Sequence, residues 1–251
     1  MPTDYRAEAA FFDRVAATAV VEPMSPHTLA RYAKPARPHL FGKEFMFSLL
    51  GDAGGKRVLE VGCGEGVASV QLAHCGAAVT GVDISPGSVA VARRRAVVQG
   101  VDAAFRVADV AGADDLGEAE FDVVWCDLIL HHLVNDLDAV LGKLRRALKP
   151  GGLFIAREPV AYAGWLKRLR SVVPVRVDAT DDERPLGVDE FAVLARHFPT
   201  ARRRYFRILA RIDRVTPRLG LIALAARADN LLLRLPGTRG LAGNAVVWAR
   251  V

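Results

Sequence analysis

Short apolar runs alternate with segments of helical periodicity through the middle of the chain. The apolar runs, rich in Val, Leu and Ile, cover residues 57–62, 78–84, 103–110, 121–130 and 153–159 and predict strands. The segments between them predict helices over residues 68–76, 85–100 and 136–152. Strands that alternate with helices of this length indicate a parallel sheet with helices on both faces.

The helix over residues 85–100 carries the clearest boundary signals. Ser85 is a good N-cap residue, Pro86 stands at the first helical position, and Gly100 follows the last turn. Each residue type suits the backbone conformation of its position, so both ends of this helix are well defined by sequence.

The flanking regions have weaker patterns. Apolar residues recur at helical spacing over residues 5–21, and four prolines then break the chain before a short helix over residues 43–50. After residue 160 we expect a helix over 188–198 and strands over 201–212 and 244–251.

A long apolar helix is predicted over residues 216–237, with Thr216 as its cap and Pro217 in its first turn. Its apolar residues form two stripes: Leu219, Ile222 and Ala226, and Leu221, Leu224, Ala228, Leu231 and Leu235. A helix that is apolar on two sides is sandwiched within the protein or a dimer, walls an apolar substrate, or lies on a membrane surface.

Charge is unevenly distributed. Residues 160–251 contain 17 Lys and Arg against 8 Asp and Glu, whereas residues 1–159 contain 17 against 20. The basic part could attract an anionic substrate, a membrane surface or nucleic acid, or it could simply be a solvated arginine-rich surface.

Location and metal content are constrained by composition. No uncharged apolar run reaches the ~18–20 residues that cross a bilayer, and the first residues lack the pattern of a signal peptide. The three cysteines, Cys63, Cys75 and Cys126, have no metal-ligand spacing. We expect a cytoplasmic protein that holds no metal and acts as a monomer or homodimer.

A glycine-rich turn follows the first strand. Gly62, Gly64 and Gly66 stand at alternate positions, which allows a tight turn and a close approach of backbone to a ligand. The spacing differs from the Gly-x-Gly-x-x-Gly of dinucleotide-binding folds, and no Lys-Ser or Lys-Thr pair follows as in phosphate-binding loops.

Two aspartates end the next two strands. Asp83 ends the second strand and could accept both ribose hydroxyls of a nucleoside, or serve only as a charge at a helix N-terminus. Asp109 ends the third and could accept from an adenine amine, or be an ordinary loop residue.

Five segments together resemble the class I S-adenosylmethionine-dependent methyltransferases. They cover residues 59–66, 81–85, 108–110, 121–133 and 148–159, and the resemblance spans about residues 56–160. It implies a Rossmann-like α/β fold with a seven-stranded, mostly parallel sheet whose last strand, residues 244–251, is antiparallel. Residues 1–55 would form a helical lid, residues 56–160 the cofactor-binding core, and residues 161–251 the part that shapes the acceptor site, including the helical insertion before the last strand.

The resemblance also implies a set of cofactor contacts. Around the methionine and ribose it places Glu60, Gly62, Cys63 and Gly64, with Asp83 on the ribose. Ile84 would flank the adenine, Asp109 and Val110 would bind its edge, and the backbone around Cys126 and Asp127 would meet the methionine end.

The implied activity is methyl transfer from S-adenosylmethionine, with S-adenosylhomocysteine as product, to a small molecule. A secondary metabolite or lipid-like acceptor methylated on oxygen is favoured. His132 is the candidate general base because imidazole accepts protons near neutral pH. A packing role would explain His132 equally well, and His131 is a weaker candidate because it is less expected to point inward. Glu158 could orient His132, or it could cap the loop before Pro159, which is slightly favoured.

Other functions remain open at this level. Tyr5 and Tyr32 are candidate lid residues, whereas Phe11 and Phe12 fit core packing better. A methyltransferase for RNA or protein would use the basic C-terminal region, but neither an RNA-binding module nor an Asn/Asp-Pro-Pro-Tyr signature is present. A non-catalytic binding protein or an oxidoreductase is a third reading, and the glycine spacing disfavours NAD.

Overall fold

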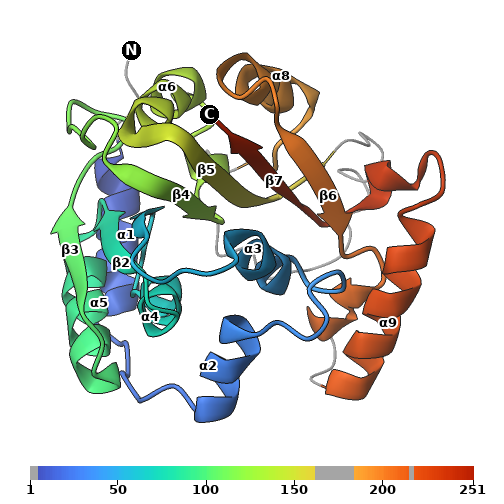
Figure 1. Ribbon diagram of the computed structural model, residues 1–251, viewed down its shortest axis with the longest axis horizontal. Helices are drawn as coiled ribbons and strands as arrows, with labels where there is room; N and C mark the ends of the chain where they lie inside the picture. The colour runs from blue at the N-terminus through green and yellow to red at the C-terminus, as the bar shows by residue number, and fades with distance from the viewer. Residues whose placement is uncertain (1–4, 162–183, 215–217) are drawn as a thin grey trace.

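A seven-stranded sheet forms the centre of the molecule in the computed structural model, which describes residues 5–161, 184–214 and 218–251 (Figure 1). Its strand order is β3-β2-β1-β4-β5-β7-β6, and only β7 runs antiparallel to its neighbours. The strands are β1 (Arg57–Val61), β2 (Ala78–Asp83), β3 (Ala103–Val107), β4 (Phe121–Asp127), β5 (Leu148–Pro159), β6 (Arg202–Phe206) and β7 (Asn244–Arg250). The predicted fold class, with its reversed last strand, is confirmed.

Helices cover both faces of this sheet (Figure 1). One face carries α3, α4 and α5, the other carries α6 and α8, and α9 lies outside β6. The helices are α1 (Arg6–Ala16), α2 (Pro26–Ala33), α3 (Gly42–Leu50), α4 (Val67–His74), α5 (Pro86–Gln99), α6 (Leu137–Ala147), α8 (Val188–His197) and α9 (Leu219–Leu232), with short 3₁₀ helices η1 (Leu130–His132), η2 (Ala210–Arg214) and η3 (Thr238–Leu241).

Alternate residues of each central strand enter two separate cores. In β4, Val123 and Trp125 pack toward α3 and α4, whereas Val124 and Cys126 pack toward α6. Because both faces are covered, the central strands are apolar throughout rather than alternately polar, which is why they read as continuous runs in the sequence.

The N-terminal region differs from its prediction. α1 ends at Ala16, whereas the prediction extended it to about residue 21. Just after this end, the backbone N–H and the hydroxyl of Thr18 both donate to the Val15 carbonyl. The sequence reading also missed α2, although Ser25 caps it and Pro26 occupies its first turn. These are the same signals that correctly predicted α5.

The region before β7 also needs correction. β6 stops at Phe206, not at residue 212, because Arg207 adopts a positive φ of 67° and the chain turns away. The buried Asp229 of α9 then accepts the N–H groups of Ile208, Leu209 and Ala210. The described part of α9 begins at Leu219, and the predicted cap and first turn at residues 216–217 lie outside the described residues.

β3 and β4 end earlier than predicted, and β5 begins earlier than predicted. β3 ends at Val107, and β4 ends at Asp127 because Leu128 has a positive φ of 65°. β5 begins at Leu148, inside the predicted helix, because Leu148 already pairs with Phe121 of β4. Tertiary pairing thus decides where helix ends and strand begins.

Glu60 is a carboxyl group in the middle of the core. It lies on β1, is 3% exposed, and accepts the Ser69 hydroxyl of α4. Burial raises its pKa to about 8, a shift that the hydrogen bond to Ser69 and the charge of Lys43 only partly oppose. The folded protein therefore keeps a proton on Glu60 that the unfolded chain releases above about pH 4.5.

The buried Glu60 makes stability depend on pH. The pKa of Glu60 is higher in the folded protein than in the unfolded chain. Its contribution to stability is therefore most favourable below pH 4.5 and is lost as the pH rises toward 8. The slope contributed is about 1.4 kcal/mol per pH unit. Chemical denaturation of Glu60→Gln from pH 5 to 8 should show a flatter profile than the native protein, with Glu118→Gln as a surface control. If the stability of Glu60→Gln changed with pH as steeply as that of the native protein, Glu60 would be ionised in the folded state.

Candidate active site

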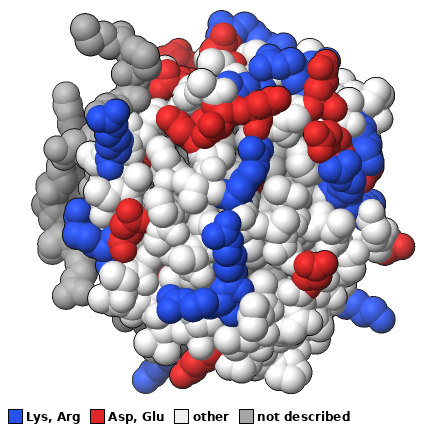
Figure 2. All heavy atoms as spheres, turned by 90° about the vertical axis from the view of Figure 1, so that its left-hand side faces the viewer, with Lys and Arg blue, Asp and Glu red and all other residues white. Residues whose placement is uncertain are grey.

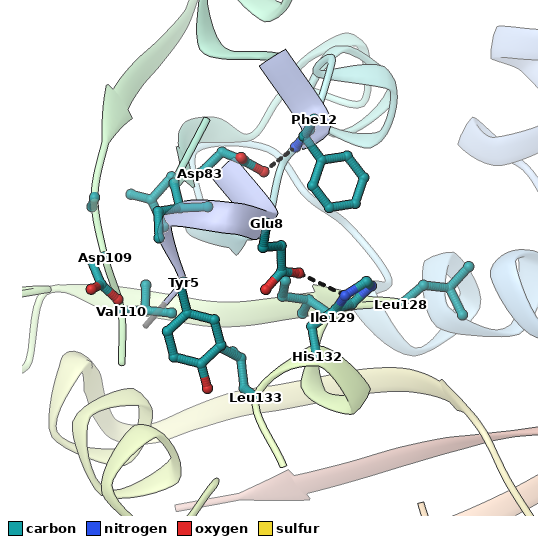
Figure 3. Close-up of a pocket in the computed structure, with 15 residues that line it drawn as sticks. Tyr5, Glu8, Phe12, Asp83, Asp109, Val110, Leu128, Ile129, His132 and Leu133 are labelled. Carbon is teal, nitrogen blue, oxygen red and sulfur yellow. Dashed lines mark hydrogen bonds and ion pairs between the residues drawn. The ribbon is translucent and has the colours of Figure 1, made fainter. Parts of the chain in front are cut away.

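A cavity of about 200 Å³ opens at the C-terminal ends of β1, β2, β3 and β4 (Figure 3). It brings together seven of the residues predicted for the site: Gly62, Gly64, Asp83, Ile84, Asp109, Val110 and His132. Parallel strands present their C-terminal ends at one edge of the sheet, so loops distant in sequence converge there.

Two glycines of the loop after β1 have different reasons to be glycine. A Cβ on Gly62 would lie 2.5 Å from the Ile129 side chain, so this position is required for packing. A Cβ on Gly64 would meet no protein atom within 4 Å, and Gly64 lines the cavity with a φ of +50°. The space beside Gly64 is therefore available to a ligand.

Asp83 ties this loop to the end of β2. Its Oδ2 accepts the Gly64 N–H at 2.8 Å and its Oδ1 accepts the Ser85 N–H at 2.9 Å. Burial raises the pKa of Asp83, and the two backbone N–H groups counteract part of that shift. Asp109 is similarly held, because its Oδ1 accepts the N–H groups of Ala111 and Gly112.

α1 covers the cavity and contributes Tyr5, Glu8 and Phe12 to its wall (Figure 3). These residues stand at i, i+3 and i+7, so they share one side of the helix. The helical lid was predicted with Tyr5 on the cavity. Glu8 was missed, although its spacing from Tyr5 and Phe12 was visible in the sequence.

Asp13 fastens α1 to the rest of the molecule. Its Oδ1 accepts the Ser85 hydroxyl at 2.6 Å and the Gly87 N–H at 2.8 Å, at the N-terminus of α5. These bonds lower the pKa of Asp13. The Tyr5 hydroxyl donates to Asp136 Oδ2 at 2.9 Å, on the far side of the cavity. Hydrogen bonds at both of its ends therefore hold α1 over the cavity.

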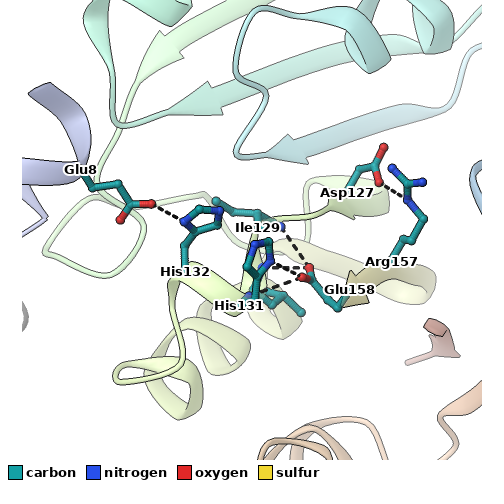
Figure 4. A network of polar contacts seen from close by, with 8 residues as sticks. Glu8, Asp127, Ile129, His131, His132, Arg157 and Glu158 are labelled. Carbon is teal, nitrogen blue, oxygen red and sulfur yellow. Dashed lines mark hydrogen bonds and ion pairs between the residues drawn. The ribbon is translucent and has the colours of Figure 1, made fainter. Parts of the chain in front are cut away.

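His132 lies opposite the glycine loop and faces α1. Its Nδ1 is 2.7 Å from Glu8 Oε1, and both side chains are nearly buried (Figure 4). The Phe12 ring packs edge-on to the imidazole at 5.9 Å between centroids. Phe12 therefore belongs to the cavity wall rather than to the core, and Tyr32, the other proposed lid residue, packs instead on Phe47.

Glu158 binds His131 and not His132, which corrects the predicted pairing. Its Oε2 lies 2.8 Å from His131 Nδ1, and its Oε1 accepts the N–H groups of Ile129 and Leu130 (Figure 4). Glu158 is fully buried on the α6 side of the sheet and so cannot reach His132, which turns toward α1. Its contacts hold the backbone of η1, the turn that carries His132.

The remaining predicted residues lie near the cavity but do not line it. Glu60 bonds to Ser69, and Cys63 and Cys126 are buried, which raises the pKa of both thiols. Asp127 faces α3, where Arg157 Nε lies 2.6 Å and Lys43 Nζ 3.6 Å from its carboxylate.

The cavity wall has an acidic character. Asp83, Asp109 and Glu8 line it, and the lining residues include neither lysine nor arginine. A wall of this kind favours a cationic ligand over a phosphate-bearing one. Over the described ranges, no group of three His, Cys, Asp or Glu side chains is placed to hold a metal ion, and no helix has the length and apolarity to cross a bilayer.

Known proteins share the central part of this chain. A family model described as a methyltransferase domain matches residues 58–152. Ubiquinone biosynthesis O-methyltransferase from Xanthomonas oryzae pv. oryzae is 40% identical over 116 residues, which are 45% of this chain and 48% of that protein. The protein of the same name from Idiomarina loihiensis is 43% identical over 45% of this chain and 46% of its own length. The chain thus spans about half the length of the curated relatives it matches.

A solved structure extends the likeness to the whole fold. Geranyl diphosphate C-methyltransferase from Streptomyces coelicolor A3(2) superposes with a TM-score of 0.63 at 15% identity, covering 99% of this chain and 98% of that one. At this identity the likeness concerns the fold alone. A methyltransferase-domain model thus matches residues 58–152, and the chain as a whole has the Rossmann-like fold of that solved structure.

Proposed function

We propose that this protein transfers a methyl group from S-adenosylmethionine to a hydroxyl group of a small-molecule acceptor. The observation that carries the proposal is the acidic cavity, in which an open glycine loop, two aspartates at strand ends and a histidine face one another. The relatives that match this chain over 116 residues are named O-methyltransferases, which supports the same reaction type.

The residues around the cavity suit this cofactor. The space beside Gly64 accommodates a chain passing close to the backbone, and the unused lone pairs of Asp83 can accept ribose hydroxyls. Ile84 and Val110 offer apolar contacts to a base, and Asp109 offers an acceptor for its amino group. When bound, the cofactor supplies an electrophilic methyl group on a sulfonium, whose positive charge the acidic wall favours.

His132 is the proposed general base. With its proton on Nδ1 facing Glu8, its Nε2 lone pair accepts the proton of the acceptor hydroxyl as the oxygen forms its new bond to carbon. The charge of the Glu8 carboxylate, 2.7 Å from Nδ1, stabilises the imidazolium that results, so Glu8 acts as a positioning residue. Glu158 acts one step further away, by fixing the backbone of η1.

The apolar wall residues suit an acceptor with apolar parts. Leu128 is 42% exposed and lines the cavity together with Ile129 and Phe12. An aromatic or lipid-like hydroxyl compound would cover this surface. Closure of α1 over such an acceptor would exclude water from the reaction.

The glycine loop gives the first test. Gly64→Val should lower affinity for S-adenosylhomocysteine by at least about tenfold, since the branched side chain fills the space beside the loop. Gly100→Val is the matched control, because Gly100 also has a positive φ and open space around it but lies at the end of α5. Both variants should lose about 1–2 kcal/mol of stability, and calorimetry should detect weaker binding only in the first. Native affinity in Gly64→Val would mean that the loop does not contact the cofactor.

Asp83 gives the second test. Asp83→Ala should weaken binding of the cofactor by ~1–3 kcal/mol, because the ribose hydroxyls of the cofactor lose a charged acceptor. In the native protein, affinity should also decline as the pH falls, beginning at a higher pH than for an exposed aspartate, because burial raises the pKa of Asp83. Asp122→Ala is the control, since Asp122 also accepts a backbone N–H but lies at the opposite edge of the sheet. Unchanged affinity with an intact fold would remove Asp83 from the binding site.

The base is tested by kinetics on an aliphatic alcohol acceptor, found by screening alcohols for S-adenosylhomocysteine formation. His132→Ala should lower kcat by ~10²–10⁴-fold without changing cofactor affinity, and the pH profile should lose an ionisation near neutrality. Glu8→Gln should give a smaller loss and a shifted profile, whereas Glu22→Gln, which is exposed beyond α1, should change neither. A loss below about tenfold for His132→Ala would assign the residue a packing role.

A further inference from the structure

The two apolar stripes predicted for α9 have different environments. In the first, Ala226 is buried against Leu40 and Ala210, and Ile222 is half-buried. The second faces outward, with exposed fractions of 43% for Leu221, 61% for Leu224, 62% for Leu231 and 53% for Leu235. Leu221, Leu224 and Leu231 are spaced to share one exposed apolar face of α9, and Leu235 is exposed just beyond the end of the helix. α9 lies at the β6 edge of the sheet, on the outside of the molecule (Figure 1).

Arginines flank this apolar face. Arg227 and Arg234 lie exposed on one side of it, and Arg239 follows in η3. The helix carries a single acidic residue, Asp229, which is 3% exposed and turns inward to bind the N–H groups of Ile208, Leu209 and Ala210. Among its own residues, α9 therefore presents apolar and cationic side chains outward and no carboxylate.

A cavity of about 280 Å³ lies beside the same helix, between α9 and β6. We call it the arginine pocket; its lining residues are Arg203, Arg204, Tyr205, Asn230, Leu233, Arg234 and Arg239. None of these four arginines forms an ion pair with any carboxylate of the described residues. Burial, together with the charge of Arg234, lowers the pKa of Arg204, so the cations repel one another.

The other side of the molecule provides a contrast. On the face that carries β3 and α5, basic and acidic side chains are interspersed over broad uncharged areas (Figure 2). A general excess of surface arginine explains neither the lack of acids on the outside of α9 nor its row of exposed leucines. An apolar face bordered by arginines is the arrangement by which helices lie in the interface of an anionic bilayer.

We propose that α9 docks this protein on membranes rich in anionic phospholipid. The exposed leucines enter the boundary between head groups and acyl chains, and the arginine pocket binds lipid phosphate groups. This surface is separate from the cofactor cavity, so it does not depend on the proposed methyl transfer. It would place the enzyme beside acceptors dissolved in the membrane.

Vesicle sedimentation tests the proposal with the whole protein. Vesicles of phosphatidylglycerol and phosphatidylcholine should bind it at least about tenfold more tightly than phosphatidylcholine alone, and added salt should weaken the binding. The double variant Leu224→Asp/Leu231→Asp should not bind either kind of vesicle. Arg234→Gln/Arg239→Gln should lose about fivefold per arginine on the anionic vesicles and little on the neutral ones.

Matched controls separate a docking surface from general effects of charge. Val97→Asp/Val98→Asp introduces the same two charges on exposed positions of α5 and should leave vesicle binding unchanged. Unfolding temperature and S-adenosylhomocysteine affinity should match the native protein in all variants. The proposal is overturned if the native protein does not bind anionic vesicles. It is overturned as well if the α5 control weakens vesicle binding as much as the leucine variant does. It is also overturned if light scattering shows a dimer that only the leucine variants dissociate, which would make this face a subunit interface.

Discussion

The two oxygens of Asp83 hold the walls of the cavity together. β1 and β2 run parallel and end at the same edge of the sheet, where the loops that follow leave backbone N–H groups without strand partners. Asp83 accepts one such group from the glycine loop, at Gly64, and another from the start of α5, at Ser85. The Ser85 side chain in turn donates to Asp13 of α1. One short chain of hydrogen bonds therefore joins the cavity floor to its lid.

This linkage makes the lid part of the site. α1 packs against α5 through Asp13, and the same placement brings Glu8 to His132. Opening α1 would break the contact between Glu8 and His132 and would uncover the cavity at the same time. In the proposed function, access for ligands and the surroundings of the proposed base are thus coupled through one helix.

The two faces of the sheet have divided roles at this edge. On the α6 side, the buried Glu158 holds His131 and the backbone of η1, so the turn that carries His132 is rigid. On the α3 side, Asp127 is held between Arg157 and Lys43. The side chains of β4 and β5 alternate between these faces, so neighbouring residues in the sequence enter separate networks. That alternation explains why Arg157 contacts Asp127 while the next residue, Glu158, contacts η1 on the other face.

The sequence by itself determined the order of the strands and of the helices between them from β1 to β5, the glycine loop, Asp83 at the end of β2 and both boundaries of α5. Those features depend on local backbone preferences and apolar periodicity, which are written in consecutive residues. The ends of β5 and β6, the partner of Glu158 and the approach of Glu8 to His132 were decided only by the tertiary structure. They depend on contacts between residues far apart in the chain, such as Leu148 with Phe121 and Asp229 with the loop after β6. The outward direction of the second stripe of α9 belongs to the same class, because periodicity defines an apolar face but not what lies against it.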